Sequence, residues 1–292
     1  MRAAFFALAL TTFALALAAT AIGSPAEPGE RSQTPGCAKA SLNLVKEGQL
    51  SLATDNPAFE PWWFGGSKSK AWETNDPRTG KGYESAVAYG IAKRLGFTKA
   101  QVTWQAVPFL KSFAPGKKSF DFYIAQVSNK PERRKAVTFS ASYYVVNQAV
   151  AALKTNPIAK VRSLAGLKRY RLGASVGTTS YDYIVRYIKP DQSPRVYDTV
   201  NDVVTAVKTK QIDGMVHDFP SMGYVTNVQI PGSTVVGRLP TLGPKEHFGL
   251  VFQKGNPLVR CVNKAINAMR RDGTLKKLEV RWLGKTGAPI LK

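Results

Sequence analysis

Short apolar runs alternate with segments of helical periodicity along the first half of the chain. The segment 83–95 places Val87, Ile91 and Leu95 on one face of a helix, and Gly96 follows as the residue expected to end it. The segments expected to form buried strands are 50–53, 102–107, 120–125 and 145–153. Strands and helices therefore alternate in this half.

The second half of the chain repeats this alternation. The expected strands are 172–176, 195–197, 212–216, 235–236 and 249–252, and the expected helices are 180–188, 201–209, 257–271 and 275–282. In the helix 257–271, four apolar side chains share one face, namely Leu258, Val262, Ile266 and Met269. The whole pattern predicts an α/β fold with mainly parallel sheets, arranged as two lobes with a helical tail.

The start of the chain has the pattern of an export signal. Arg2 precedes an apolar run over residues 3–19, and small residues follow it, so residues 1–21 are expected to be a cleaved signal peptide. A membrane anchor is the alternative, but the run is short and Thr11 and Thr12 interrupt it. Residues 22–41 are expected to form a flexible leader, because Pro, Glu, Ser and Gly dominate its first part. The mature protein is thus expected in the periplasm or outside the cell.

Composition and charge narrow the class of protein. A chain of 292 residues with 44% hydrophobic content can bury a core in two modest domains, which excludes disorder as its main state. Lys and Arg number 41 against 19 Asp and Glu, which gives a net charge of +22. The basic residues are scattered over several elements rather than gathered in one stripe, so attraction to an anionic cell envelope explains the charge more simply than binding to nucleic acid.

The two cysteines and two histidines do not suggest a metal site. Cys37, His217, His247 and Cys261 lack the paired spacing of a zinc site, and no cofactor is expected. An exported chain with two cysteines suggests a single disulfide between Cys37 and Cys261. Lipidation of Cys37 is the alternative, although the preceding residues 34–36 form a poor lipoprotein signal.

A series of short motifs gives the chain a family resemblance over residues 42–284. They occur in the order Thr54-Asp55-Asn56-Pro57-Ala58-Phe59, Gly82-Tyr83-Glu84, Pro131-Glu132-Arg133 with Phe139-Ser140 and Tyr143-Tyr144, Gly177-Thr178-Thr179, Val216-His217-Asp218, and Asp272-Gly273-Thr274-Leu275 with Trp282-Leu283-Gly284. Each motif alone is weak, but their order and spacing are specific. The chain resembles family 3 of the extracellular solute-binding proteins, which are the polar amino-acid-binding proteins of bacterial ABC importers.

The resemblance implies the type II periplasmic-binding-protein fold, in which two lobes close around a ligand. Lobe 1 would comprise residues 42–145 and 248–286, lobe 2 would comprise 146–247, and the hinges would lie near 144–148 and 246–249. It also implies a monomer that passes an amino acid, or a close analogue, to an ABC permease in the membrane. The alternatives are a periplasmic lyase similar to the cyclohexadienyl dehydratases and a ligand-sensing receptor for a signalling partner.

Four side chains would hold the ligand's head group if the resemblance is followed. Arg133 matches the guanidinium that pairs with the α-carboxylate, with Arg134 as the alternative if the register is one residue off. Asp218 matches the partner of the α-ammonium. Thr178 and Thr179 open a helix in lobe 2, where they would donate hydrogen bonds to the carboxylate or merely cap that helix.

Two further positions belong to this head-group set. Ser128 matches a position that hydrogen-bonds the ligand. Gln126 stands where many relatives have Gly or Ser, which puts the family's backbone contact there in doubt.

Aromatic residues would select the ligand's side chain. Phe59 and Phe109 match positions that sandwich the ligand, and Trp62 with Trp63 adds bulk at the mouth of the cleft. Asp55 and Glu60 are candidates to contact a ligand amine or guanidinium, although the sequence does not say which way they point.

Catalysis is not expected. His217 and Asp218 are adjacent in an extended segment, so their side chains point to opposite sides and cannot act as a dyad.

Overall fold

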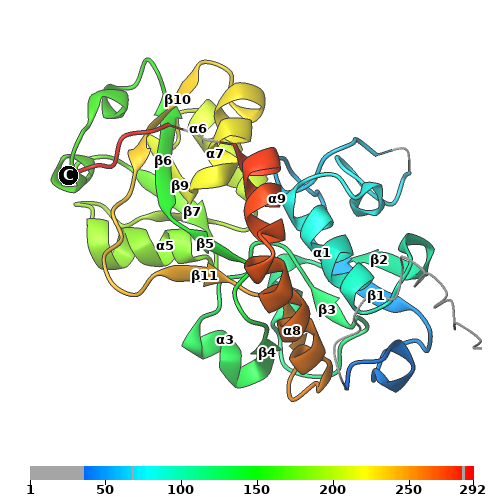
Figure 1. Cartoon of the computed structure of the whole chain (residues 1–292). Helices are drawn as coiled ribbons and strands as arrows, with labels where there is room; N and C mark the ends of the chain where they lie inside the picture. The colour runs from blue at the N-terminus through cyan, green and yellow to red at the C-terminus, as the bar shows by residue number, and fades with distance from the viewer. Residues whose placement is uncertain (1–35, 68, 285–286) are drawn as a thin grey trace, which may run out of the picture. The chain divides into compact units, whose positions relative to one another are not determined.

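The computed structural model describes residues 36–67, 69–284 and 287–292. The strands within these residues form two five-stranded sheets and one two-stranded sheet (Figure 1). The first five-stranded sheet has the order β2-β1-β3-β12-β4. Its strands are β1 (Leu50–Thr54), β2 (Val102–Ala106), β3 (Phe122–Tyr123), β4 (Val137–Phe139) and β12 (Val251–Gln253). Strand β1 pairs in parallel with β2 and β3, whereas β12 is antiparallel to β3 and β4.

Three helices cover this sheet, namely α1 (Tyr83–Arg94), α8 (Leu258–Arg271) and α9 (Thr274–Leu283). The four apolar positions expected to face inward from the helix 257–271 are all buried. Gly96 has a φ of 86°, so the residue after the cap of α1 adopts the left-handed conformation that ends many helices, as the sequence predicts.

The second five-stranded sheet has the order β10-β6-β9-β7-β8. Its strands are β6 (Gln148–Leu153), β7 (Leu172–Ser175), β8 (Arg195–Tyr197), β9 (Gly214–Asp218) and β10 (Ser233–Arg238). Strand β7 is parallel to β8 and β9, and β6 is antiparallel to β9 and β10. Alternate residues of β6 enter different apolar clusters, because successive side chains of a strand point to opposite faces, so both faces of this sheet are buried.

Helices α5 (Thr179–Tyr183) and α6 (Val200–Lys208) contact this second sheet. The short helices elsewhere are α2 (Phe109–Ser112), α3 (Pro131–Ala136), α4 (Leu164–Leu167) and α7 (Met222–Tyr224). The 3-10 and π turns are η1 (Lys39–Ser41), η2 (Pro77–Thr79), η3 (Lys99–Gln101), η4 (Pro157–Lys160), η5 (Ile184–Ile188), η6 (Phe219–Ser221) and η7 (Val225–Gln229).

Two strands carry the chain from one large sheet to the other. Strand β5 (Tyr144–Val146) runs directly into β6, and β11 (Glu246–Phe248) leads into β12; the two pair antiparallel with each other. They coincide with the segments expected to act as hinges. The single strand expected at 145–153 is therefore two strands, because its first part pairs with β11 and its second part with β9 and β10.

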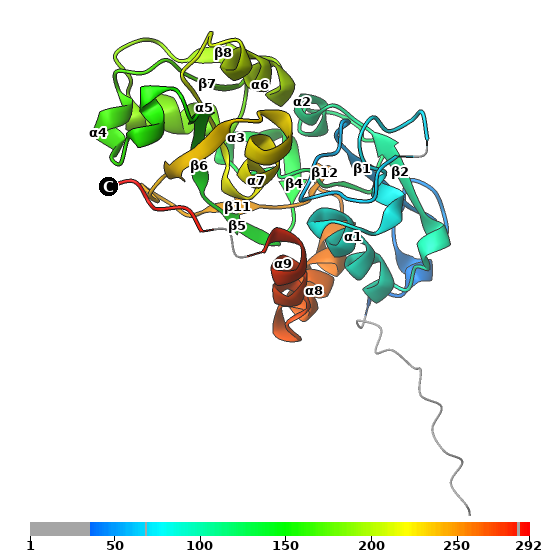
Figure 2. The same cartoon turned by 90° about the horizontal axis from the view of Figure 1, so that it is seen from above.

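The last six residues return to the second sheet, which the sequence did not indicate. Ile290 forms a parallel bridge with Arg238 of β10, and the backbone N–H of Leu291 donates to the carbonyl of Arg238. Leu291 is buried in an apolar cluster of that sheet. Figure 2 shows this end of the chain beyond α9.

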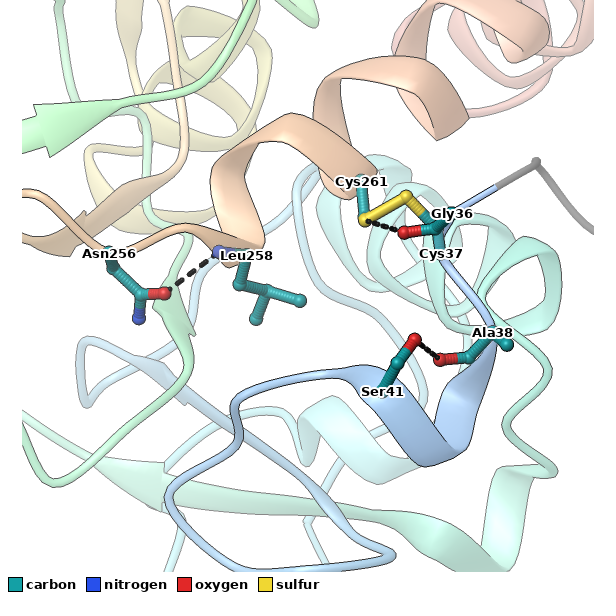
Figure 3. Close-up of a disulfide and its surroundings, with 7 residues drawn as sticks. All are labelled: Gly36, Cys37, Ala38, Ser41, Asn256, Leu258 and Cys261. Atoms are coloured by element: carbon teal, nitrogen blue, oxygen red, sulfur yellow. Dashed lines mark hydrogen bonds between the residues drawn. A yellow bond between two sulfur atoms is a disulfide. The ribbon is translucent and has the colours of Figure 1, made fainter.

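The disulfide between Cys37 and Cys261 is present, which confirms the pairing expected from the sequence (Figure 3). It joins residues 224 apart in sequence, with Cα atoms 5.5 Å apart. The loop-entropy argument gives such a long loop a stabilising contribution of at most about 5 kcal/mol. Residues 37–41, the end of the expected leader, are thereby tied to α8. The expected signal peptide and the rest of the leader lie outside the described residues.

No described helix is both long and apolar enough to cross a bilayer.

Candidate functional site

A cavity of about 750 Å³ is lined by segments that follow strands of both large sheets. These segments leave β1, β2, β3, β7 and β9 at their carboxyl ends, which is where ligand sites form in α/β proteins. Its volume is that of a pocket for a small organic ligand. All nine residues that the sequence suggested for ligand binding line it, namely Phe59, Trp62, Phe109, Gln126, Ser128, Arg133, Thr178, Thr179 and Asp218.

Arg133 is a buried cation at the cavity wall. It lies on α3, which begins with proline at its first position, and only 6% of the residue is exposed, whereas Arg134 is exposed and does not line the cavity. Two of its nitrogens donate to the carbonyls of Ser128 and Gly177, each at 2.8 Å. Burial lowers the pKa of Arg133 to about 10, so the guanidinium stays charged at neutral pH.

The face of the Arg133 guanidinium is covered by aromatic rings. Its central carbon lies 4.3 Å from the ring centre of Phe113 and 5.3 Å from that of Phe109. Such stacking stabilises the cation and fixes the plane of its fork. Only two of the five N–H groups of Arg133 are used by the two carbonyls, so the fork retains donors for a ligand.

The two threonines at the start of α5 have different tasks. Thr178 is the N-cap residue: its hydroxyl accepts from the backbone N–H of Tyr181 at 3.3 Å and donates to the carbonyl of Ser175 at 2.7 Å. The hydroxyl of Thr179 instead donates to Glu246 at 2.6 Å. The capping role left open by the sequence therefore belongs to Thr178.

Glu246 of β11 is a central polar residue that sequence reasoning missed. Its Oε1 accepts from the hydroxyls of Ser128, at 2.5 Å, and Thr179, so it connects segments from both large sheets. Its Oε2 accepts from Nε2 of Gln148 at 3.0 Å. No motif marks Glu246 or Gln148; the only signal was that both lie in the expected hinge segments.

Asp218 ends β9 and pairs with Gln148 of β6 in the sheet register. Its Oδ1 accepts from Nε2 of Gln148 at 2.7 Å. Burial, reinforced by the charge of Glu246, raises the pKa of Asp218 well above its usual range. Strand β9 both starts and ends two residues later than the sequence indicated. Asp218 is therefore the last residue of β9 rather than a residue beyond it.

His217, the neighbour of Asp218, is a neutral group. Burial lowers the pKa of His217 to about 4, so its imidazole carries no charge at neutral pH. Because successive residues of a strand alternate in direction, the side chains of His217 and Asp218 point to opposite faces.

Gln126 is held from behind by a buried acid. Its φ is 48°, and both its backbone N–H and its side-chain amide donate to the carboxylate of Glu84 on α1. The hydroxyl of Tyr143 donates to the same carboxylate, whose pKa burial raises to about 7. The side chain of Gln126 is thus engaged with Glu84 rather than free to seek a ligand.

Trp62 is more deeply placed than the sequence suggested. It is 1% exposed, and its ring packs edge-on against Tyr83, Tyr144 and Phe248, beside the two crossing strands. Its indole N–H donates to the hydroxyl of Ser221 at 2.8 Å. Trp62 lines the cavity from within rather than at a solvent-exposed mouth. Trp63 is also buried, against Trp104.

The loop after β1 adds acidic groups and an aromatic ring. Asp55 and Glu60 both line the cavity. Burial raises the pKa of Asp55 to about 6, although the backbone N–H groups of Asn56 and Phe109 oppose this by donating to it. Burial also raises the pKa of Glu60. The ring centre of Phe59 lies 5.7 Å from that of Tyr224, which belongs to α7.

The described residues contain no cluster of His, Cys, Asp and Glu that could hold a metal ion. The guanidinium of Arg133 on α3 and the carboxyl of Asp218 at the end of β9 line one cavity together with hydroxyl, amide and aromatic groups.

Comparison with known proteins identifies a family and relatives for the chain. Residues 67–285 match the model of the bacterial extracellular solute-binding proteins, family 3. The L-cystine-binding protein TcyJ of Escherichia coli strain K12 is 27% identical over 244 residues, which cover 83% of this chain and 86% of that protein.

Two solved structures share the fold. An ancestral arginine-binding protein bound to arginine is 27% identical, with a TM-score of 0.65, and the match covers 80% of this chain and 98% of that one. The ancestral amino acid-binding protein AncCDT-1, a precursor of cyclohexadienyl dehydratase, is 26% identical, with a TM-score of 0.63, over 81% of this chain and 95% of that one.

Proposed function

Because the chain belongs to the bacterial extracellular solute-binding proteins of family 3, we propose that it captures a free amino acid in the cavity around Arg133. The observation that carries this proposal is the meeting of Arg133 and Asp218, from elements of different sheets, at one cavity of about 750 Å³. The guanidinium fork matches an α-carboxylate, and the carboxyl of Asp218 matches an α-ammonium.

A ligand held in this way would favour closure. Residues 42–145 with 248–286 form one lobe in this proposal and residues 146–247 the other, with β5 and β11 as the hinge. A zwitterion that pairs with Arg133 on one lobe and Asp218 on the other makes both contacts only when the lobes are together. Its binding free energy is then the energy that shifts the population towards the closed form.

The wider role follows from the same proposal. The chain would be exported by the segment 1–21, act as a monomer in the periplasm or at the cell surface, and deliver its ligand to an ABC permease. Cystine and arginine are the ligands named for two similar proteins. Among amino acids, the acidic residues Asp55 and Glu60 favour one with a cationic side chain, because they line the same cavity.

A thermal-shift screen of the refolded, ligand-free protein tests the proposal. The panel is the twenty amino acids with ornithine, citrulline and cystine. A ligand at about 100 times its dissociation constant adds about 2.7 kcal/mol, which at this size raises the midpoint by about 5–10 °C. One or a few strong hits are expected. A midpoint that no amino acid moves would contradict the proposal.

An enzymatic role is the second candidate, because a similar structure is a precursor of cyclohexadienyl dehydratase. A carboxylic acid whose pKa is raised by burial, as that of Asp218 is, could also serve as a general acid. Incubation with prephenate followed by mass spectrometry separates the two roles. The binding role predicts that prephenate is recovered unchanged, and its depletion would favour the lyase.

A further inference from the structure

The carboxylate of Glu246 accepts hydrogen bonds from the hydroxyls of two residues that the proposed function requires as donors to the ligand. Ser128 and Thr179 both donate to the same atom, Oε1, at 2.5 and 2.6 Å. An ionised carboxylate has no proton to give, so both hydroxyls must be the donors in these bonds. Each hydroxyl has only one proton, and each then turns a lone pair, not a proton, towards the cavity that it lines.

This arrangement conflicts with the recognition of a ligand carboxylate. If Ser128 and Thr179 help Arg133 to bind that group, as the proposed function holds, their protons must leave Glu246. Glu246 and the ligand thus compete for the same two donors. The inference rests on the proposed function, because it concerns the affinity of that same site.

The second carboxylate oxygen of Glu246 also has a partner. Gln148 donates from one atom, Nε2, to Oε2 of Glu246 at 3.0 Å and to Oδ1 of Asp218 at 2.7 Å. The two acids are therefore no further apart at these oxygens than the sum of those distances. Arg133 on α3 is the buried cation whose charge acts on both.

We infer that Glu246 sets the affinity of the cavity through the hydroxyls of Ser128 and Thr179. Its carboxylate accepts both hydroxyl hydrogen bonds and so weakens binding of the ligand's carboxylate. Glu246 is a positioning residue in this account, because it acts through the two hydroxyls.

Glu246→Gln tests the inference, because the amide keeps the shape of the acid and its N–H can donate to one hydroxyl oxygen, which frees that hydroxyl to donate to the ligand. The probe is L-glutamine, which has no side-chain charge, or L-alanine if glutamine does not move the unfolding midpoint. Titration calorimetry on the native protein and the variant, in the same buffer, measures the dissociation constant.

We expect Glu246→Gln to bind about tenfold more tightly than the native protein. The matched control is Glu47→Gln, an exposed glutamate, which should behave as the native protein does. Ser128→Ala with Thr179→Val removes the contested hydroxyls, so in that background Glu246→Gln should no longer change the affinity. Glu246→Ala, which removes the acceptor altogether, gives the same test if Glu246→Gln folds poorly.

A Glu246→Gln variant that binds no more tightly than the native protein, or a gain in affinity that persists without the two hydroxyls, would overturn the inference and leave the proposed function intact. Failure of the native protein to bind any amino acid would contradict the proposed function itself.

Discussion

The polar residues around Arg133 and those around Asp55 line the same cavity, but the structure holds them in different ways. Around Arg133, nearly every polar group bonds to a partner on another element: its own nitrogens to two carbonyls, and Ser128 and Thr179 to Glu246. Asp55 and Glu60 lie on one loop after β1, and the partners of Asp55 are backbone N–H groups. The first group is fixed by several elements, whereas the second depends on a single loop.

This difference suggests a division of labour. A group fixed by several elements suits the carboxylate and ammonium that every α-amino acid shares, because its geometry does not change with the ligand's side chain. A loop can vary without disturbing the sheets, so the Asp55 group is where discrimination between side chains is expected. Substitutions in the two groups should therefore have different signatures.

The largest effect is expected from Arg133→Ala. Removal of a buried, charge-assisted partner costs about 2–5 kcal/mol, so affinity for every amino acid that binds should fall by about 30-fold or more. Arg133→Lys keeps the charge but loses the fork and should recover only part of the loss. Calorimetry on each variant provides the measurement.

Arg134→Ala is the matched control for this effect, because Arg134 is the exposed neighbour that does not line the cavity. An equal loss in Arg134→Ala would show that the fall reflects general charge rather than the fork of Arg133.

A smaller and more selective effect is expected from the two aspartates. Asp218→Asn removes the anion opposite the α-ammonium, and binding of any amino acid should weaken by about tenfold or more. Asp55→Asn should change affinity for glutamine by less than about threefold, because glutamine has no cation for Asp55 to meet. If both variants weaken glutamine equally, the two groups do not have separate tasks.

The contrast also separates what the sequence could predict from what it could not. All nine residues suggested for the site line one cavity, because they follow strands whose order the motifs preserve. Their contacts with a ligand remain predictions. The motif order could not reveal Glu246, in the crossing strand β11, or Gln148, at the start of β6, because neither segment has a motif of its own.

Local pattern failed in a similar way elsewhere in the fold. Apolar content alone made residues 145–153 look like one strand, although the chain changes partners after Val146. The aromatic character of Trp62 suggested a position at the mouth, but its burial depends on Ser221, which is distant in sequence. Pairing partners and tertiary hydrogen bonds decide these features, and neither is written in a local segment.

The most diagnostic effect is the pH dependence expected from Asp55. The pKa of Asp55 is about 6 because burial disfavours its ionised form. A ligand with a side-chain cation, such as L-arginine, stabilises the ionised form and should bind progressively more tightly as pH rises from 5 to 7. The fold itself responds in the opposite direction: Asp55 holds a proton that the unfolded chain releases, so its contribution to the free energy of unfolding falls between pH 4 and 6.

Comparing two ligands isolates this effect from the rest of the site. The ratio of the affinities for L-arginine and L-glutamine cancels changes at the shared head-group residues, so only the Asp55 group contributes to its slope. That ratio should rise by up to about tenfold between pH 5 and 7 in the native protein. In Asp55→Asn it should stay level, because the amide does not titrate. A ratio that still rises in Asp55→Asn would place the discrimination elsewhere, with Glu60 on the same loop as the next residue to substitute.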